Sequence, residues 1–185
     1  MHLARRAFMR ASGAALLTVA APALVRASNA NLPAKGLRRL SLHNLHTNEK
    51  LAADYCIDGK YQPEVLAGFN KFLRDWRTGE IHHIDPRLFD LLTDINAGME
   101  ATTGFEVISG YRSPETNGKL HDRSSGVASH SLHMEGMAMD VRLPGKALTT
   151  LQQCALAQGK GGVGFYPNSN FVHVDVGRVR RWNGS

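Results

Sequence analysis

The chain has 185 residues, a formal net charge of +6, 43% hydrophobic residues and two cysteines. This length favours one domain, large enough to bury a core without disulfide or metal support. The charge is uneven: the first 27 residues hold four of the 22 lysines and arginines and no acid, which leaves 18 basic against 16 acidic residues in the rest. No run of basic residues interleaved with aromatics remains, which argues against a nucleic-acid-binding protein.

The N-terminus has the pattern of an export signal. Residues 5–10, RRAFMR, fit the R-R-x-F-x-R pattern of twin-arginine signals, and the apolar run at 14–21 is shorter than the ~20 residues of a membrane span. We therefore predict a signal over residues 1–27, cleaved near Ser28, a linker over 28–36 and one domain over 37–185. This predicts a periplasmic protein with no stable membrane span after cleavage; an uncleaved amphipathic arm is the alternative.

The first part of the domain predicts a hairpin and a helix. Residues 37–46 and 50–57 are strand-like and joined by a short turn. His43 and His46 would face opposite sides of a strand, so a shared metal is not expected. A helix should begin at Pro63 and end near Gly79. Its apolar stripe, which we expect to lie in the core, consists of Val65, Leu66, Phe69, Phe72, Leu73 and Trp76.

A second helix should follow Asp85, which suits the N-cap, with Pro86 in the first turn. The adjacent histidines, His82 and His83, then belong to the preceding loop and not to a metal site. The apolar stripe of this helix consists of Leu88, Leu91, Leu92, Ile95 and Met99. Export would permit a disulfide between Cys56 and Cys154, although two small buried hydrophobic side chains are the preferred interpretation.

Residues 105–109 predict a buried strand that ends just before Arg112. A guanidinium at a strand end can bind a substrate carboxylate or the oxyanion formed during amide hydrolysis. A surface ion pair is the alternative. A helix over about 115–122 and a polar loop over 123–130 should follow, with His130 as a bystander.

The stretch most suggestive of chemistry is 131–140, SLHMEGMAMD. In a continuous helix His133 and Asp140 would lie roughly 10 Å apart, too far for one ion. Gly136 indicates instead a turn into a strand over 137–143, which could bring both groups to one zinc ion. His173, in the strand-like run 171–175, would be the third ligand, and the fourth position would be left for water. From spacing alone, a loop histidine and a solvated acid remain the alternative.

The C-terminal part predicts a helix over about 148–156 that ends at Gly159, then a hairpin of 163–166 against 171–176. The glycine-rich run 159–164 lacks the G-K-[ST] ending of a phosphate-binding loop, so it is interpreted as the entry into this hairpin. Within the last strand, His173 and Asp175 should point to the same side.

The pattern S-x-H-x-x-G-x-A-x-D, with a later strand carrying the third ligand, resembles the zinc DD-peptidase family. Residues 108–113 (ISGYRS), 161–167 (GGVGFYP) and 170–173 (NFVH) also resemble family segments, and residues 42–47 with the arginine leader resemble its MepK-like murein endopeptidase branch. The resemblance covers nearly the whole chain after the leader. It implies an α+β, hedgehog/DD-peptidase-like fold in which a small antiparallel sheet carries the zinc site and helices pack against it.

The resemblance also implies a function. Zn²⁺ on His133, Asp140 and His173 would activate water to hydrolyse peptide crosslinks of peptidoglycan, with Arg112 binding the substrate. The diaminopimelate–diaminopimelate and D-alanine–diaminopimelate crosslinks are the expected substrates. The alternatives are a DD-carboxypeptidase that trims terminal D-alanine and a noncatalytic, zinc-stabilised cell-wall-binding module.

One position departs from the family pattern. Many relatives carry a Glu or His general base three residues before the third ligand, where this chain has Asn170, which cannot take a proton. Asp175 could serve as a base through water or orient His173, and the orienting role is preferred.

Overall fold

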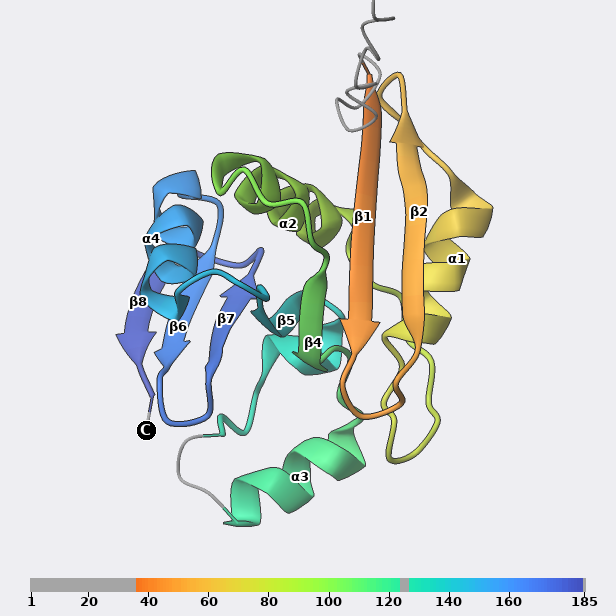
Figure 1. Ribbon diagram of the computed structural model, residues 1–185. Helices are drawn as coiled ribbons and strands as arrows, with labels where there is room; N and C mark the ends of the chain where they lie inside the picture. The colour runs from red at the N-terminus through yellow and green to blue at the C-terminus, as the bar shows by residue number, and fades with distance from the viewer. Residues whose placement is uncertain (1–35, 124–126, 185) are drawn as a thin grey trace, which may run out of the picture. The chain divides into compact units, whose positions relative to one another are not determined.

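The computed structural model describes residues 36–123 and 127–184. The predicted export signal, 1–27, and the linker up to residue 35 lie outside these described residues. Within them the chain forms one eight-stranded sheet with the order β3-β2-β1-β4-β5-β7-β6-β8 (Figure 1). None of the described helices combines the length and the apolar character that crossing a membrane requires.

The elements follow one another in mixed order, which confirms an α+β domain. The strands are β1 (Leu37–Asn44), β2 (Lys50–Ile57), β3 (Lys60–Tyr61), β4 (Phe105–Ser109), β5 (Ala138–Arg142), β6 (Gly162–Tyr166), β7 (Phe171–Asp175) and β8 (Arg180–Asn183). The helices are α1 (Pro63–Phe72), α2 (Pro86–Gly98), α3 (Pro114–Arg123), the 3₁₀ helix η1 (Leu132–Glu135) and α4 (Leu148–Gln158).

The sheet is larger and more mixed than the small antiparallel sheet that we expected. The predicted hairpins β1–β2 and β6–β7 are both present. However, β1 also pairs in parallel with β4, and β6 in parallel with β8. Parallel partners need a long crossover, so a local sequence pattern does not reveal them. Within the run β4-β5-β7-β6, which surrounds the predicted site, each adjacent pair of strands is antiparallel, as expected.

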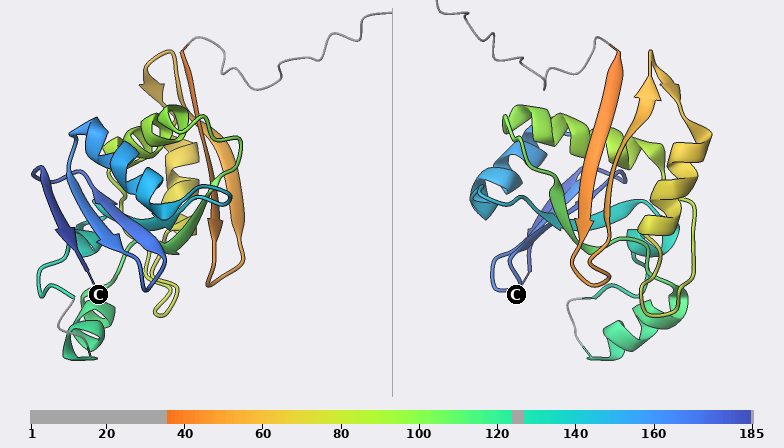
Figure 2. Two further views of the ribbon diagram at one scale, coloured as in Figure 1. Left: turned by 60° about the vertical axis from the view of Figure 1, so that its left-hand side comes forward. Right: turned by 45° about the vertical axis from the view of Figure 1, so that its right-hand side comes forward.

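The core lies between the sheet and helices α1, α2 and α4, which gather on one of its faces (Figure 2). Met139 and Val141 of β5 face these helices and are fully buried. Successive strand side chains alternate, so Asp140 points to the opposite face, which we call the open face. If β5 slipped by one residue, its core-facing side chains would move to the open face and Asp140 would move into the core. Core packing therefore fixes the position of Asp140.

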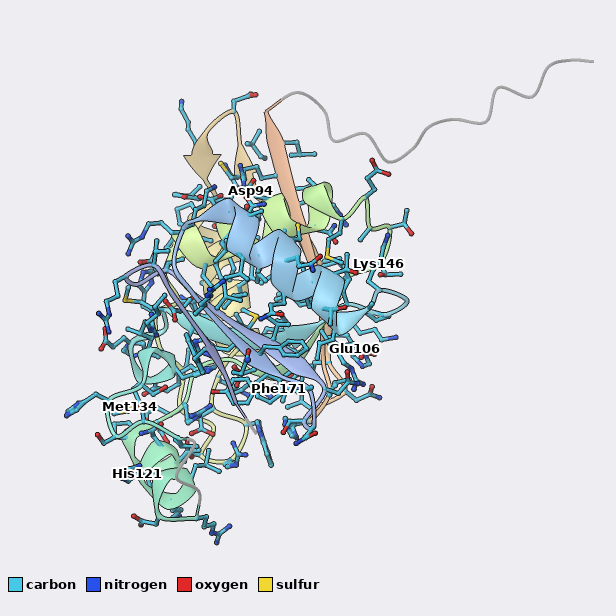
Figure 3. The ribbon with its side chains drawn as sticks, turned by 90° about the vertical axis from the view of Figure 1, so that its left-hand side faces the viewer. Asp94, Glu106, His121, Met134, Lys146 and Phe171 are labelled. Carbon is cyan, nitrogen blue, oxygen red and sulfur yellow. The ribbon has the colours of Figure 1, made fainter. Side chains whose placement is uncertain are left out.

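Ion pairs join α2 to its neighbours. Asp94 of α2, which is labelled in Figure 3, accepts a hydrogen bond from Arg38 of β1 (2.7 Å) and forms an ion pair with Lys160, which follows α4 (2.5 Å). Arg38 and Asp94 are half-buried and Lys160 is exposed, so these contacts supplement the apolar core and do not replace it.

The helix predictions are mostly confirmed, with one correction. Asp85 caps α2 by accepting the N–H of Arg87, and the predicted apolar stripe of α2 is buried. Helix α1 begins at Pro63 but ends at Phe72, earlier than expected. Trp76 therefore lies outside the helix, is 40% exposed and stacks on His46 (ring centroids 4.3 Å apart), so its expected place in the core was wrong. Both cysteines are free thiols.

Candidate metal centre

A tight turn separates the first two predicted ligands. Ser131 caps η1 by accepting the N–H of His133 (3.4 Å), and Gly136 ends η1 with φ at 66°. This left-handed conformation favours glycine, and a side chain at this position would also collide with the His83 carbonyl. The chain then enters β5. This is the predicted turn and strand, and it brings the side chains of His133 and Asp140 to the same place.

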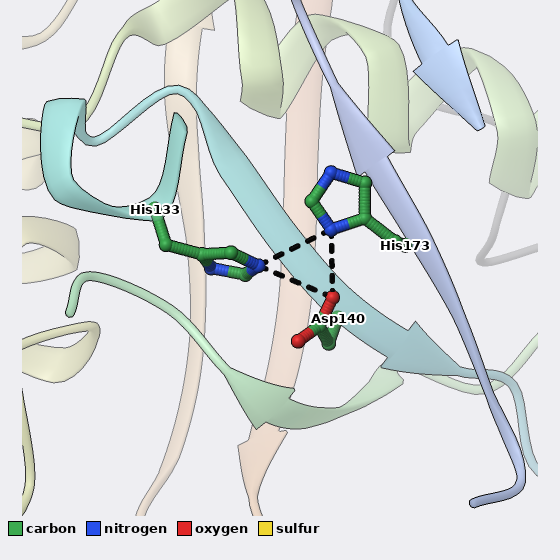
Figure 4. A group of neighbouring side chains, drawn as sticks. All are labelled: His133, Asp140 and His173. Carbon is green, nitrogen blue, oxygen red and sulfur yellow. Dashed lines mark hydrogen bonds and ion pairs between the residues drawn. The ribbon is translucent and has the colours of Figure 1, made fainter. Parts of the chain in front are cut away.

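Strand pairing brings in the third residue, because Asp140 of β5 lies directly opposite His173 of β7. Asp140 Oδ1 lies 3.2 Å from His133 Nε2 and 2.9 Å from His173 Nδ1, and the two nitrogens are 3.2 Å apart (Figure 4). Tetrahedral zinc ligands at their usual bond lengths are separated by roughly 3.3–3.6 Å. Among the residues that the structure describes, this is the only group of three or more such side chains within metal-binding distance.

In each histidine, the ring nitrogen that points away from the proposed metal position makes a hydrogen bond. This bond determines the state of the other nitrogen, which faces the proposed metal position. His133 Nδ1 lies 2.8 Å from the Gly110 carbonyl, which can only accept, so Nδ1 carries the proton and Nε2 presents a lone pair. His173 Nε2 lies 3.1 Å from the Asp175 carboxylate, which accepts its proton, so the neutral form of this ring presents an Nδ1 lone pair to the centre. Burial would lower the pKa of His173, but hydrogen bonds to Asp140 and Asp175 raise it. With both rings neutral, two nitrogen lone pairs and a carboxylate oxygen converge on one point, which is an arrangement of donors that binds a metal cation. This donor set suits zinc.

The three groups are buried, with at most 8% of each residue exposed. Burial lowers the pKa of His133, so this ring is neutral. Burial alone would raise the pKa of Asp140, but contacts with both histidines outweigh it and hold the pKa well below its usual range. A neutral imidazole and an ionised carboxylate are the states in which these groups bind metals.

Asp175 lies behind His173 and is fully buried. It accepts hydrogen bonds from the backbone N–H groups of Gly162 and Gly177 (2.9 Å each) and forms an ion pair with Arg180 (2.8 Å). Burial would raise its pKa, but the hydrogen bond from His173 and these other donors lower it. Asp175 contacts the ring nitrogen that faces away from the centre. This geometry favours the orienting role over that of a base.

Arg112 projects from the end of β4 beside the centre, and only 8% of the residue is exposed. Its guanidinium lies 3.3 Å from Asn117 Oδ1, 3.4 Å from Ser109 Oγ and 3.6 Å from Asp140 Oδ2. Burial lowers its pKa. Among the described residues no acceptor contacts its Nε. A buried donor without a partner is costly, so the Arg112 guanidinium keeps hydrogen-bonding capacity that its described protein neighbours do not use.

A cleft of about 290 Å³ opens onto Arg112 and the three converging side chains. A larger groove, about 470 Å³, lies over β1, β2 and β4, but His133, Asp140 and His173 are not part of it. The smaller cleft is the candidate site because it joins ligand atoms to a guanidinium. Its walls also contain three residues that the sequence analysis did not single out: Tyr166, Arg180 and Trp182.

Other polar residues of interest are not part of the converging group of His133, Asp140 and His173. Asn170 is exposed at the β6–β7 turn, with φ at 55°. Asparagine tolerates this left-handed conformation better than glutamate does, so the backbone conformation at this position favours asparagine. His43 bonds to Asn48, and His82 stacks on Tyr111. His130 lines the outer part of the cleft.

Comparisons with known proteins support the predicted resemblance. The sequence model of the family described as "Peptidoglycan L,D-endopeptidase MepK" matches residues 32–182. The Escherichia coli (strain K12) protein of that name is 47% identical over 146 residues, which cover 78% of this chain and 80% of that protein. A Haemophilus influenzae protein described as "Probable peptidoglycan L,D-endopeptidase MepK" is 38% identical over 148 residues, 80% of each chain. The chain belongs to the MepK family of peptidoglycan endopeptidases.

Proposed function

We propose that this protein is a zinc-dependent endopeptidase that hydrolyses peptide crosslinks in peptidoglycan. The observation that carries the proposal is the convergence of three lone pairs, from His133, Asp140 and His173, at the base of a cleft in a MepK-family chain. The relatives are named as endopeptidases, which does not favour the carboxypeptidase alternative. A cleft that leads to the centre gives a substrate access, as catalysis requires.

The chain's own groups would each have a distinct role. His133, Asp140 and His173 hold zinc, and Gly110 and Asp175 fix the two imidazole rings. Bound zinc supplies a Lewis acid that polarises a peptide carbonyl and lowers the pKa of water. The Arg112 guanidinium binds the carbonyl oxygen or a nearby carboxylate of the substrate.

The bond that we propose is cleaved joins an L-configured to a D-configured centre, as the relatives' names indicate for those proteins. A diaminopimelate–diaminopimelate crosslink contains such a bond. It also carries free carboxylates, which the Arg112 guanidinium in the cleft would bind. D-Alanine–diaminopimelate dimers, in which both centres are D-configured, are the comparison substrate.

A muropeptide digest tests the function. Zinc-loaded mature protein would be incubated with each purified crosslinked dimer, with and without a chelator, and the products identified by mass. We expect chelator-sensitive conversion of dimers to monomers, lost in His133→Ala and retained in His43→Ala, whose side chain lies away from the cleft. Release of free D-alanine would instead indicate a carboxypeptidase. Intact dimers with retained binding to sacculi would indicate a wall-binding module.

We also propose export to the periplasm through the twin-arginine route, supported by residues 5–10 and by a substrate that lies outside the cytoplasm. The mature chain would begin near Ser28. Replacing Arg5 and Arg6 with lysine should keep the protein in the cytoplasm. An exported protein that still began at Met1 would disprove cleavage.

A further inference from the structure

The glycine-rich run has a role at the candidate site. Gly162 and Gly164 of β6 pair with Arg180 and Trp182 of β8. A Cβ at Gly164 would lie only 2.5 Å from the Trp182 indole, so glycine allows this ring to lie across β6. The Trp182 ring thereby comes within 5.1 Å of the His173 ring, measured between centroids. Strand β8 thus forms a wall of the cleft.

Tyr166 is held rigidly beside this wall. Its ring stacks on Phe171 of β7, with centroids 4.5 Å apart and planes 19° apart. The backbone at Gly184 packs so closely on the ring that a Cβ there would collide with it. The Trp182 indole N–H donates to the Tyr166 hydroxyl oxygen over 2.9 Å. Fixed rings of this kind hold a polar group in one place.

These contacts leave the hydroxyl proton of Tyr166 free to donate. An indole N–H can only donate, so the Tyr166 oxygen accepts from Trp182 and its own proton points elsewhere. Within residues 36–123 and 127–184, no protein acceptor takes this proton. Tyr166 lines the same cleft as Arg112, Asp140 and His173. A bond accepted from the indole also strengthens the hydroxyl as a donor.

We propose that Tyr166 donates a hydrogen bond to the carbonyl oxygen of the scissile peptide, and that Trp182 is the positioning residue that orients it. This inference rests on the proposed function. The bond strengthens as that oxygen gains negative charge, and donors aimed at developing charge are usually the largest single contribution to catalysis. Arg112 cannot supply the whole effect alone, because its two terminal nitrogens are already shared with Asn117, Ser109 and Asp140.

The test uses zinc-loaded mature protein and a crosslinked dimer. Tyr166→Phe keeps the ring stacked on Phe171 but removes the hydroxyl. We expect kcat to fall on the order of 10²-fold with KM nearly unchanged, because the lost interaction acts in the transition state. Zinc content and melting temperature should match those of the wild type. Tyr61→Phe, which removes a hydroxyl that contacts Asp90 outside the cleft, should leave kcat unchanged.

Two further readouts separate this role from a structural one. A dimer analogue with a phosphinate at the scissile bond mimics the charged transition state, so its Kd should rise in Tyr166→Phe by a factor similar to the fall in kcat. Trp182→Phe should lower kcat in the wild type but add nothing in the Tyr166→Phe background, because it acts through that hydroxyl. An additive effect would refute the positioning role of Trp182.

The outcomes also distinguish this inference from the proposed function. Wild-type cleavage with equal kcat and equal phosphinate affinity in Tyr166→Phe would overturn the role of Tyr166 and leave the function standing. A zinc-loaded wild type that cleaves no dimer would overturn both.

Discussion

Asp175 is proposed to orient His173, one of the three proposed metal ligands. Replacing it with asparagine would place an amide among several donors, including His173 Nε2 and Arg180. An amide cannot accept from all of them, so the imidazole would lose its fixed orientation. We expect Asp175→Asn to weaken zinc binding by about 10–100-fold, the usual effect of removing such a partner. Competition with a chromophoric chelator measures this affinity.

The matched control is Asp54→Asn, which alters an exposed ion pair with Arg39 far from the cleft. Its zinc affinity should equal that of the wild type. Unchanged affinity in Asp175→Asn would mean that Asp175 does not orient His173.

Individual residues of the site differ in how far the sequence could predict them. His133, Asp140 and His173 follow a pattern of fixed spacing, and the structure brings them together. The missing base at Asn170 was visible in the sequence, but its positive φ was not. Tyr166 looks like an ordinary strand residue in the sequence. Its hydroxyl is oriented by a hydrogen bond from the indole of Trp182, which comes from a different strand, so the sequence around Tyr166 does not reveal its role.

The loop after α1 is tied to the start of α3 by Asp75. This residue is 1% exposed, and its carboxylate accepts the N–H and the hydroxyl of Ser113 (2.9 and 2.7 Å). Burial would raise the pKa of Asp75, but hydrogen bonds from Thr116 and Ser113 lower it from 3.8 to about 2. The ionised carboxylate is therefore specifically stabilised in the folded protein, next to Arg112.

Because its pKa is lowered, the ionised Asp75 carboxylate contributes to the stability of the fold in a way that depends on pH. This contribution is fully present above the ordinary pKa of 3.8 and is lost as the pH falls through about 2. At about 1.4 kcal/mol per pKa unit, Asp75→Asn should lower the free energy of unfolding by about 2 kcal/mol at pH 7. Urea unfolding at several pH values should show this difference shrinking below about pH 4. A difference that is constant with pH would contradict it.

The close packing of β6 against β8 gives a second prediction at the scale of elements. Gly164→Ala would force the Trp182 indole away, so we expect a loss of about 1–3 kcal/mol of stability, typical of overpacking. Gly118→Ala is the control, because it lies in α3 with no atom near its Cβ and should stabilise the protein by up to about 1 kcal/mol. Thermal unfolding of both variants measures the contrast. Equal stability of the two would refute close packing at Gly164.

Elements with a local signal were predictable, and elements defined by distant partners were not. Helix α2 has a capping aspartate, a proline and an apolar stripe, and all three were recognised. Strand β8 is short and mostly polar, so no alternation of apolar and polar residues marks it in the sequence. Its parallel pairing with β6 has no local signal either. The stripe of α1 extends to Trp76 in the sequence, but the helix stops at Phe72.

At the scale of the whole molecule, the sheet acts as a frame that holds the three proposed metal ligands together. Core packing of β5 and β7 fixes Asp140 opposite His173, and the η1 turn adds His133. Only the folded protein therefore presents these three side chains to one point. The unfolded chain does not hold these groups together, so zinc should favour the folded state.

We therefore expect zinc to raise the melting temperature of the metal-free protein. At free zinc 100 times Kd, binding contributes about 2.7 kcal/mol, which corresponds to roughly 5–10 °C for a domain of this size. Calorimetry with and without zinc measures the shift, which His133→Ala should abolish and His43→Ala should retain. Since this measurement needs no substrate, it tests the metal centre separately from catalysis. If zinc left the melting temperature unchanged while binding stoichiometrically, the bound ion would not be held by the folded triad.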